Sequence, residues 1–313
     1  MNIKYKELYK AAISDKVNGI IVEYSPYNKT YCYRQFSHMT NDKALEDLYE
    51  IIINNTVFYA FSESEIVSSH DKFGLLDDLR AAAMYSFAER LPKRNHPDSD
   101  GTIGEILLDL LIQVYEPSSQ KLVARAKHTE IGKKSEITGY DALYFTKHGE
   151  DITLWLGQAK AGSESYCKGD IKKDLNTKYS AEYFSNTVFY ITTRSESDDL
   201  LNILNEINKL CFDAQKNKYS KDQKIAGLFE ILKNHGVKVK VPCLLAYTKD
   251  IYSNQSLLKE EVEKCTKQIC NYFDDENFSF EIPISYEIVF YVFPIKDVSY
   301  IRNKIVDLKK EVI

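Results

Sequence analysis

The sequence predicts an α/β fold, with a mixed β-sheet flanked by helices and a smaller N-terminal α+β region. Short runs rich in β-branched and aromatic residues alternate with longer segments of helical apolar spacing. The 313 residues are 44% hydrophobic and 28% charged, which is typical of a soluble globular protein. This length accommodates one large or two modest domains with an ample core.

The N-terminal region combines both kinds of element. We expect a strand, a turn and a second strand within residues 19–33, and helices over 43–54 and 75–91. The segment LPKRNHPDSDG then holds two prolines and has no apolar period, so it is the best candidate linker. We place a boundary near residue 95, which separates an N-terminal unit (1–95) from a larger unit (96–313).

The segment TIGEILLDLLIQVYE, which begins at Thr102, is apolar around most of a helical wheel. Its polar residues form one narrow stripe of Glu105, Asp109, Gln113 and Glu116. An acidic stripe on a mostly buried helix is unusual. Two interpretations of Glu105 remain open: it completes a capping box with Thr102, or it supplies an acid to a metal site.

A β-hairpin is predicted from residues 138–146 and 152–160, which flank the polar turn segment KHGED. With the turn centred between Gly149 and Glu150, Asp141 lies opposite Gln158. Directly opposed residues share a face, and period-two alternation adds Lys160 to that face. A carboxylate, an amide oxygen and an ammonium group are therefore expected together on one β-ribbon.

This trio suits the hydrolysis of phosphodiesters with a divalent metal. Mg²⁺ prefers oxygen ligands and keeps several waters. Asp141 would be the anionic ligand and Gln158 a neutral one. Lys160 would hold or help deprotonate the attacking water and offset charge on the phosphorane. A hairpin with an ordinary polar outer face would explain Asp141 and Lys160, but not a polar trio among apolar neighbours.

Glutamine in place of an acid at position 158 leaves such a site one negative charge short. Metal affinity should then be weak unless another acid, such as Glu105, contributes. Mn²⁺ should be a better cofactor than Mg²⁺, because Mn²⁺ binds a given site more tightly. The change Gln158→Glu should be tolerated or raise metal affinity.

Further elements follow on both sides of the hairpin. We expect strands at 121–128, 186–193, 237–248 and 285–295, and helices at 169–179, 198–212, 222–234, 255–273 and 296–312. Strands that alternate with helices predict an extended mixed sheet.

The order of acidic helix, strand, Asp141 strand, Gln158-x-Lys160 strand and helix resembles the PD-(D/E)XK nuclease superfamily, in the QxK variant of Mrr-like restriction enzymes. The chain is most similar to the HamA family, the nuclease subunit of Hachiman anti-phage systems, over about residues 79–195. The resemblance implies a restriction-endonuclease-like core. It also implies the catalytic residues Glu105, Asp141, Gln158 and Lys160, of which the first three would hold Mg²⁺ or Mn²⁺, and a helicase partner resembling HamB. Gln158 departs from the glutamate of many members.

The charge distribution favours contact with nucleic acid near the hairpin. The net charge is −5, but residues 121–178 hold eleven Lys and Arg against eight Asp and Glu, which gives +3 and leaves −8 elsewhere. The candidate nucleic-acid-binding residues are Lys127, Lys133, Lys134, Lys168, Lys172 and Lys173. Lysine greatly outnumbers arginine, which favours phosphate contacts over base reading, and so binding without strong sequence specificity.

Several other functions are not supported. The six cysteines include no CxxC pair, which argues against a zinc site, and IGKKS lacks the upstream glycine of a phosphate-binding P-loop. The N-terminal segment has no signal-like apolar core, and no apolar run is long enough to span a bilayer. A cytoplasmic location without membrane contact is expected.

These observations together predict a metal-dependent DNA nuclease subunit of a prokaryotic anti-phage complex, controlled by a helicase. Two alternatives remain. One is a catalytically degenerate nuclease fold that binds DNA or docks a helicase, because Gln158 weakens the site. The other is a stand-alone type IV-like restriction enzyme, although the first 95 residues resemble no modified-base reader.

Overall fold

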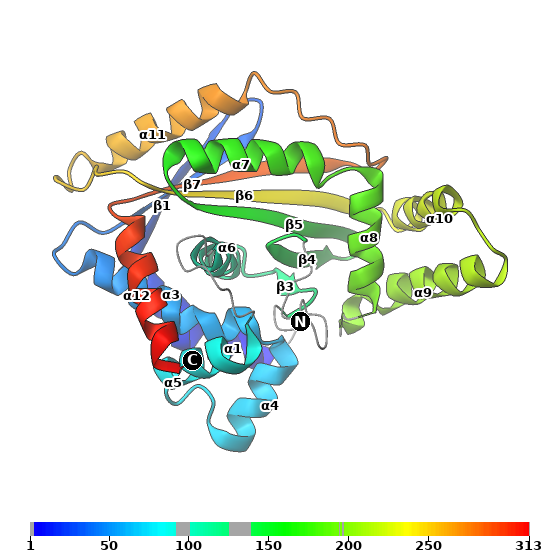
Figure 1. Ribbon diagram of the computed structural model, residues 1–313, viewed down its shortest axis with the longest axis horizontal. Coiled ribbons are helices and arrows are strands. Elements are labelled where there is room, and N and C mark those ends of the chain that lie inside the picture. Colours follow the sequence, from blue (N-terminus) through cyan, green and yellow to red (C-terminus); the bar gives the residue numbers. More distant parts are fainter. Residues whose placement is uncertain (1–2, 92–100, 125–138, 194, 196, 313) are drawn as a thin grey trace.

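One seven-stranded mixed β-sheet lies between two layers of helices in the computed structural model (Figure 1). The structure describes residues 3–91, 101–124, 139–193, 195 and 197–312. This architecture confirms the predicted α/β class. Within the described ranges, every helix is too short or too polar to traverse a lipid bilayer.

The sheet order is β1-β2-β7-β6-β5-β4-β3. The strands are β1 (Ile21–Asn28), β2 (Cys32–His38), β3 (Gln120–Lys121), β4 (Ala142–His148), β5 (Asp151–Gly162), β6 (Lys238–Thr248) and β7 (Tyr286–Ile295). Strands β2, β7, β6 and β5 run parallel to their neighbours in that order, whereas β1, β4 and β3 pair antiparallel at the two edges. Parallel strands buried on both faces read as continuous apolar runs, as in PCLLAY of β6.

The helices of the N-terminal region cover one face of the sheet, together with α6 and α12. They are α1 (Ile3–Tyr9), α2 (Asp15–Val17), α3 (Ala44–Ala60), α4 (Glu63–Phe73), α5 (Leu79–Tyr85), α6 (Thr102–Tyr115) and α12 (Val298–Val312). A single apolar cluster joins these helices to the strands, with Leu48, Leu107 and Ile301 among its fully buried members. We call this side the α6 face.

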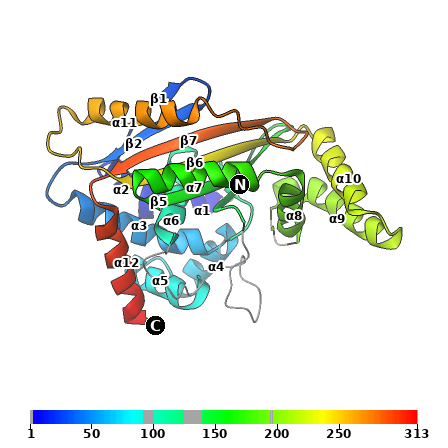
Figure 2. The ribbon, with the colours of Figure 1, turned by 45° about the horizontal axis from the view of Figure 1, so that its top comes forward.

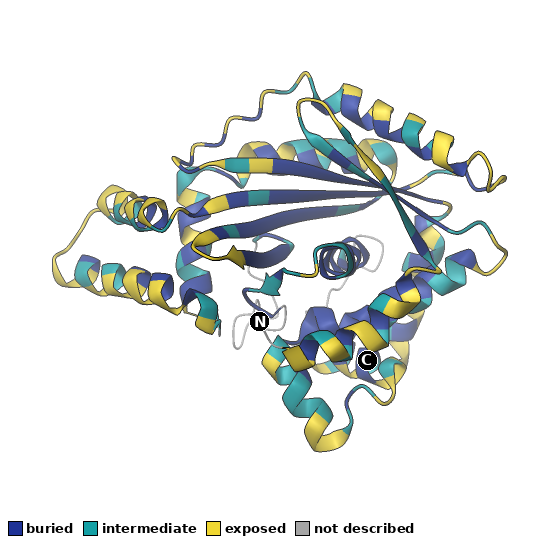
Figure 3. Cartoon of the chain, turned by 180° about the vertical axis from the view of Figure 1, so that it is seen from behind, coloured by how far each residue is buried: buried dark blue, intermediate teal, exposed yellow. Residues whose placement is uncertain are grey.

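The opposite side, the α7 face, is covered by α7 (Glu164–Thr177), α8 (Ala181–Thr192) and α11 (Leu258–Phe273). Beside α8, helices α9 (Leu201–Lys216) and α10 (Lys221–Asn234) project away from the sheet as an arm (Figure 2). Figure 3 shows buried residues along the central strands and many exposed residues on this arm.

The prediction of a strand at 186–193 is wrong, because this segment belongs to helix α8. Its β-branched and aromatic residues favoured a strand, but the buried residues Phe184, Val188 and Ile191 recur at helical spacing. The Ser180 hydroxyl caps the helix by accepting a hydrogen bond from the Tyr183 amide at 3.3 Å. Burial against the α7 face and this cap together override strand propensity.

The first two strands extend the same sheet as the hairpin, since β2 pairs in parallel with β7. The apolar cluster of the α6 face also includes residues from both sides of position 95. The proposed linker residues 92–100 lie outside the described residues. Of the strand expected at 121–128, β3 covers Lys121, and the part beyond residue 124 is likewise not described.

Candidate active site

The hairpin of β4 and β5 has the register expected from the sequence. Ala142 pairs with Gly157 and His148 pairs with Asp151, so the turn consists of Gly149 and Glu150 alone. Gly149 has φ +61°, which suits the first central position of a type II′ turn. This two-residue turn sets which side chains of β5 point to each face of the sheet.

Asp141 lies where the chain of β4 parts from β5. Its amide donates to the Gly157 carbonyl at 2.8 Å, and its Oδ2 accepts a hydrogen bond from the Ala159 amide at 2.8 Å. The carboxylate thus takes the place of a main-chain acceptor at the end of the ladder. A main-chain contact of this kind holds the carboxylate in one place beside β5.

Side chains of β5 alternate between the two faces. Trp155, Ala159 and Ala161 join the apolar cluster of the α6 face, and Leu154 and Leu156 join that of the α7 face. Gln158 and Lys160 are even-numbered like Leu154 and Leu156, so they point to the same face. Their polar partners lie on α7 or directly after it. Both residues therefore face α7, as the shared-face prediction requires.

Lys160 is held as a charged group by two carboxylates. Its Nζ lies 2.7 Å from Oδ2 of Asp174 on α7, and only 15% of its side chain is exposed. Burial alone lowers the pKa of Lys160, but the charges of Asp141 and Asp174 outweigh burial and raise this pKa above its ordinary value. Lys160 can therefore donate hydrogen bonds and offset negative charge, but it is poorly suited to accept a proton.

Gln158 is fully buried, and its Oε1 accepts a hydrogen bond from Lys178 Nζ at 2.7 Å. Lys178, the residue that follows α7, also lies 3.1 Å from Oδ2 of Asp174. The Gln158 Nε2 atom has no hydrogen-bond partner among the described residues. A single chain of polar contacts thus runs from Lys160 through Asp174 and Lys178 to Gln158.

Glu105 lies on the other side of the sheet. Residue Gly104 packs on β5, where a Cβ atom would lie 3.5 Å from the side chains of Ala159 and Ala161. The Glu105 carboxylate is buried and accepts a hydrogen bond from the Tyr59 hydroxyl. The N-cap of the helix is Gly101, with Thr102 as its first helical residue, which does not match the interpretation of Thr102 as the cap of a capping box.

Asp141 also reaches the α6 face. Together with Tyr59, Asp109 and Lys121 it lines a small cavity of about 20 Å³, room for one water molecule. Tyr59, which lines this cavity, also donates a hydrogen bond to the buried Glu105 carboxylate. Asp141 therefore lines a cavity with Asp109 and Lys121 on the α6 face, while its charge also acts on Lys160.

The donor set fits a divalent ion only in part. Mg²⁺ and Mn²⁺ can be held by one or two carboxylates with several waters, and Asp141 and Glu105 are suitable donors. The Gln158 oxygen already accepts a hydrogen bond from Lys178. Among the described residues, no group of three or more His, Cys, Asp or Glu side chains forms a metal cage.

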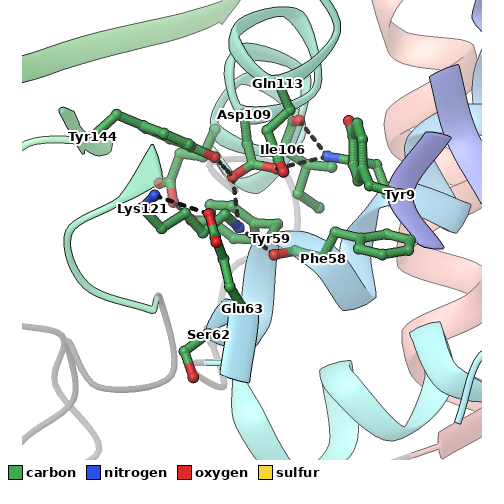
Figure 4. A network of polar contacts seen from close by, with 12 residues as sticks. Tyr9, Phe58, Tyr59, Ser62, Glu63, Ile106, Asp109, Gln113, Lys121 and Tyr144 are labelled. Carbon is green, nitrogen blue, oxygen red and sulfur yellow. Dashed lines mark hydrogen bonds and ion pairs between the residues drawn. The ribbon is translucent and has the colours of Figure 1, made fainter. Parts of the chain in front are cut away.

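The remaining acidic stripe of α6 is structural, and Figure 4 shows its centre at Asp109. This buried carboxylate accepts hydrogen bonds from the Tyr144 hydroxyl, from Asn55 at 2.8 Å and from Gln113 at 2.7 Å, and it pairs with buried Lys121 at 2.9 Å. Glu116, at the end of the stripe, pairs with Arg34 at 2.7 Å. Partners from several elements thus account for the stripe.

Comparison with protein families matches residues 11–308 to HamA. The chain belongs to the HamA family. Membership makes it a protein of Hachiman defence, and the match spans both the N-terminal strands and the hairpin of β4 and β5. A search among curated proteins returns no match.

The candidate DNA-binding lysines of this HamA-family protein differ in their surroundings. On α7, Lys168 pairs with Glu164 at 2.8 Å and Lys172 pairs with Glu276, whereas Lys173 is exposed. Both paired lysines also lie over the Tyr272 ring. The other three, Lys127, Lys133 and Lys134, lie outside the described residues.

Asp174 was not predicted as a site residue, and Lys178 was counted only within the basic surplus of residues 121–178. Their separation of four residues on a predicted helix directly after the Gln158-x-Lys160 strand was the available signal, because such residues share one helix face. Nothing in the sequence showed that this face would cover Gln158 and Lys160.

We expect Asp109→Ala to lower the free energy of unfolding by about 3–5 kcal/mol, because it leaves the Lys121 ammonium buried without its carboxylate. Urea denaturation followed by circular dichroism measures this loss. Glu230→Ala, at an exposed position on α10, is the control and should change stability by less than about 0.5 kcal/mol. Equal stability of the two variants would contradict a structural role for Asp109.

Proposed function

We propose that this chain is the metal-dependent DNA nuclease subunit of a Hachiman anti-phage complex. The observation that carries the proposal is Lys160, held as an ammonium group on the strand beside the fixed Asp141 carboxylate. A charged, partly buried lysine next to a carboxylate at the end of a strand pair suits stabilisation of a phosphorane. Membership of the HamA family agrees with this chemistry.

The roles follow from the positions of the side chains. Asp141 and Glu105 would hold Mg²⁺ or Mn²⁺, which when bound lowers the pKa of a water molecule and stabilises the leaving oxygen. Lys160 would donate to a non-bridging phosphate oxygen and offset the charge that develops on it. Asp174 would keep the Lys160 ammonium in place through their 2.7 Å contact.

DNA would be bound through its phosphates. The exposed Lys173 and the partly neutralised Lys168 and Lys172 line α7, the helix that covers Lys160. Point charges of this kind favour binding without strong sequence specificity. A nuclease of that type in the cytoplasm must be restrained, and we propose that a helicase subunit resembling HamB provides the control.

A second candidate function is a nuclease fold that has lost catalysis and serves to bind DNA or dock the helicase. It is favoured by the contact between Gln158 and Lys178, which removes one oxygen from the possible metal ligands. Catalysis by the purified protein decides between the two.

We expect purified protein to cleave plasmid DNA with Mn²⁺, less well with Mg²⁺, and not with excess EDTA. Lys160→Ala should reduce the rate at least a hundredfold, because the charge next to the phosphate is lost. Lys209→Ala, at an exposed site on α9, removes a lysine from a helix that carries none of the site residues and serves as the control. Cleavage that persists in EDTA, or in Lys160→Ala, rules out this function.

The charge of Lys160, rather than a neutral amine, should be what catalysis needs. The folded-state pKa is raised, so the ammonium form persists through neutral and mildly alkaline pH and is lost only above the ordinary range near 10.4. We therefore expect no loss of rate from Lys160 deprotonation between pH 7 and 9. Lys160→Arg should retain at least tenfold more activity than Lys160→Met.

Rates of single-turnover cleavage across this pH range provide the measurement. An activity that requires a neutral amine would rise with pH and would be abolished equally by both substitutions. Such a result would make Lys160 a general base and contradict its assignment as a charged donor.

Control by a helicase predicts a stable complex. The chain should co-elute with the HamB-like protein of its own operon in gel filtration at micromolar concentration, and the complex should cleave intact plasmid more slowly than the isolated subunit. Separate elution at that concentration, or equal cleavage rates, would contradict restraint by the partner.

A further inference from the structure

The amide oxygen of Gln158 binds an ammonium group of the protein itself, that of Lys178. Lys178 Nζ lies 2.7 Å from this oxygen, the distance of a charge-assisted hydrogen bond. Gln158 has no exposed surface, so water does not compete for the oxygen. The contact therefore satisfies the Gln158 oxygen within the protein.

The position of Lys178 is fixed from its main chain outward. Its carbonyl accepts a hydrogen bond from the Tyr140 hydroxyl at 2.6 Å, and the next residue, Tyr179, donates its hydroxyl to the Leu156 carbonyl at 2.7 Å. These two tyrosines tie the end of α7 to the hairpin. Asp174 adds a carboxylate 3.1 Å from the ammonium, which is only partly exposed.

A divalent ion on the same oxygen would meet this ammonium at close range. Like charges a few ångströms apart repel strongly where water is excluded. A neutral amide suits residue 158, because its oxygen accepts a hydrogen bond from Lys178 and leaves the positive charge of Lys178 uncancelled. A carboxylate at position 158 would instead form an ion pair with Lys178.

We propose that Lys178 takes the place of a metal ion at residue 158, so that Gln158 is a positioning residue for Lys178 and not a metal ligand. The ammonium groups of Lys160 and Lys178, which share Oδ2 of Asp174, then form one cationic pair on the α7 face. This inference rests on the proposed function, because it concerns the metal and phosphate chemistry of the same site. It replaces the expectation from sequence that Gln158 is a metal ligand.

The test is Mn²⁺ binding measured by electron paramagnetic resonance, a readout that needs no cleavage. The full-length protein is compared with Gln158→Ala, Gln158→Glu, Lys178→Met and the double variant Gln158→Glu/Lys178→Met. Lys216→Met, an exposed position on α9, removes the same charge from a helix that carries none of the site residues and controls for net charge. Thermal melting of each variant checks that it is folded.

We expect Gln158→Ala to bind Mn²⁺ within about twofold of the unaltered protein, and Gln158→Glu within about threefold, because Lys178 captures the new carboxylate. The double variant should bind at least tenfold more tightly than Gln158→Glu, since its carboxylate is released. Weaker binding by at least tenfold in Gln158→Ala, equal tightening in Gln158→Glu and the double variant, or no Mn²⁺ binding by any variant would each overturn the proposal.

The single variants at residue 158 decide the matter alone if Lys178→Met fails to fold. The expected binding pattern without any DNA cleavage would leave this inference standing and would refute the nuclease function. Metal-dependent cleavage together with tenfold weaker Mn²⁺ binding in Gln158→Ala would support the nuclease function and would refute this inference.

Discussion

The pairing of β4 with β5 determines where Asp141, Gln158 and Lys160 lie. A turn of two residues permits one register, and a slip by one residue would exchange the faces of all β5 side chains. The register is also enforced by burial, because Trp155 and Leu156 enter different apolar clusters on the two sides of the sheet. Gln158 and Lys160 thereby meet α7, while Ala159 meets α6 and Asp141.

The charges around this hairpin are divided between the two faces. On the α7 face, one carboxylate holds two ammonium groups, and on the α6 face Glu105 and Asp109 are buried with hydroxyl, amide and ammonium partners. Buried charges are tolerated only when they are paired in this way. Asp141 lines a cavity with Asp109 and Lys121 and its charge also acts on Lys160, which makes it the residue best placed to connect a bound ion with the Lys160 charge.

Local pattern was sufficient to predict the hairpin, its register and the shared face of Gln158 and Lys160, because turn chemistry and period-two alternation act over a few residues. It failed where tertiary contacts decide. The strand predicted at 186–193 is a helix because Phe184, Val188 and Ile191 bury one helical face. The pattern around Thr102 left two roles open for Glu105, and neither included Tyr59, 46 residues earlier in the chain, which donates a hydrogen bond to its carboxylate.

The partner of Gln158 could not be predicted either, because a tertiary contact brings it into place. Lys178 is 20 residues away, and only the packing of α7 on β5 brings its ammonium to the amide oxygen. Local pattern predicted residue 158 as a neutral metal ligand because its amide oxygen shares a face with Asp141 and Lys160. Physical context, not the motif, decides which cation that oxygen accepts.

The position of the ion is the central claim, and anomalous scattering from a crystal soaked with Mn²⁺ tests it most directly. The account predicts a peak within about 2.0–2.4 Å of an Asp141 carboxylate oxygen, with Lys178 still bonded to the Gln158 oxygen. A peak at that distance from Gln158, with Lys178 displaced, would contradict it.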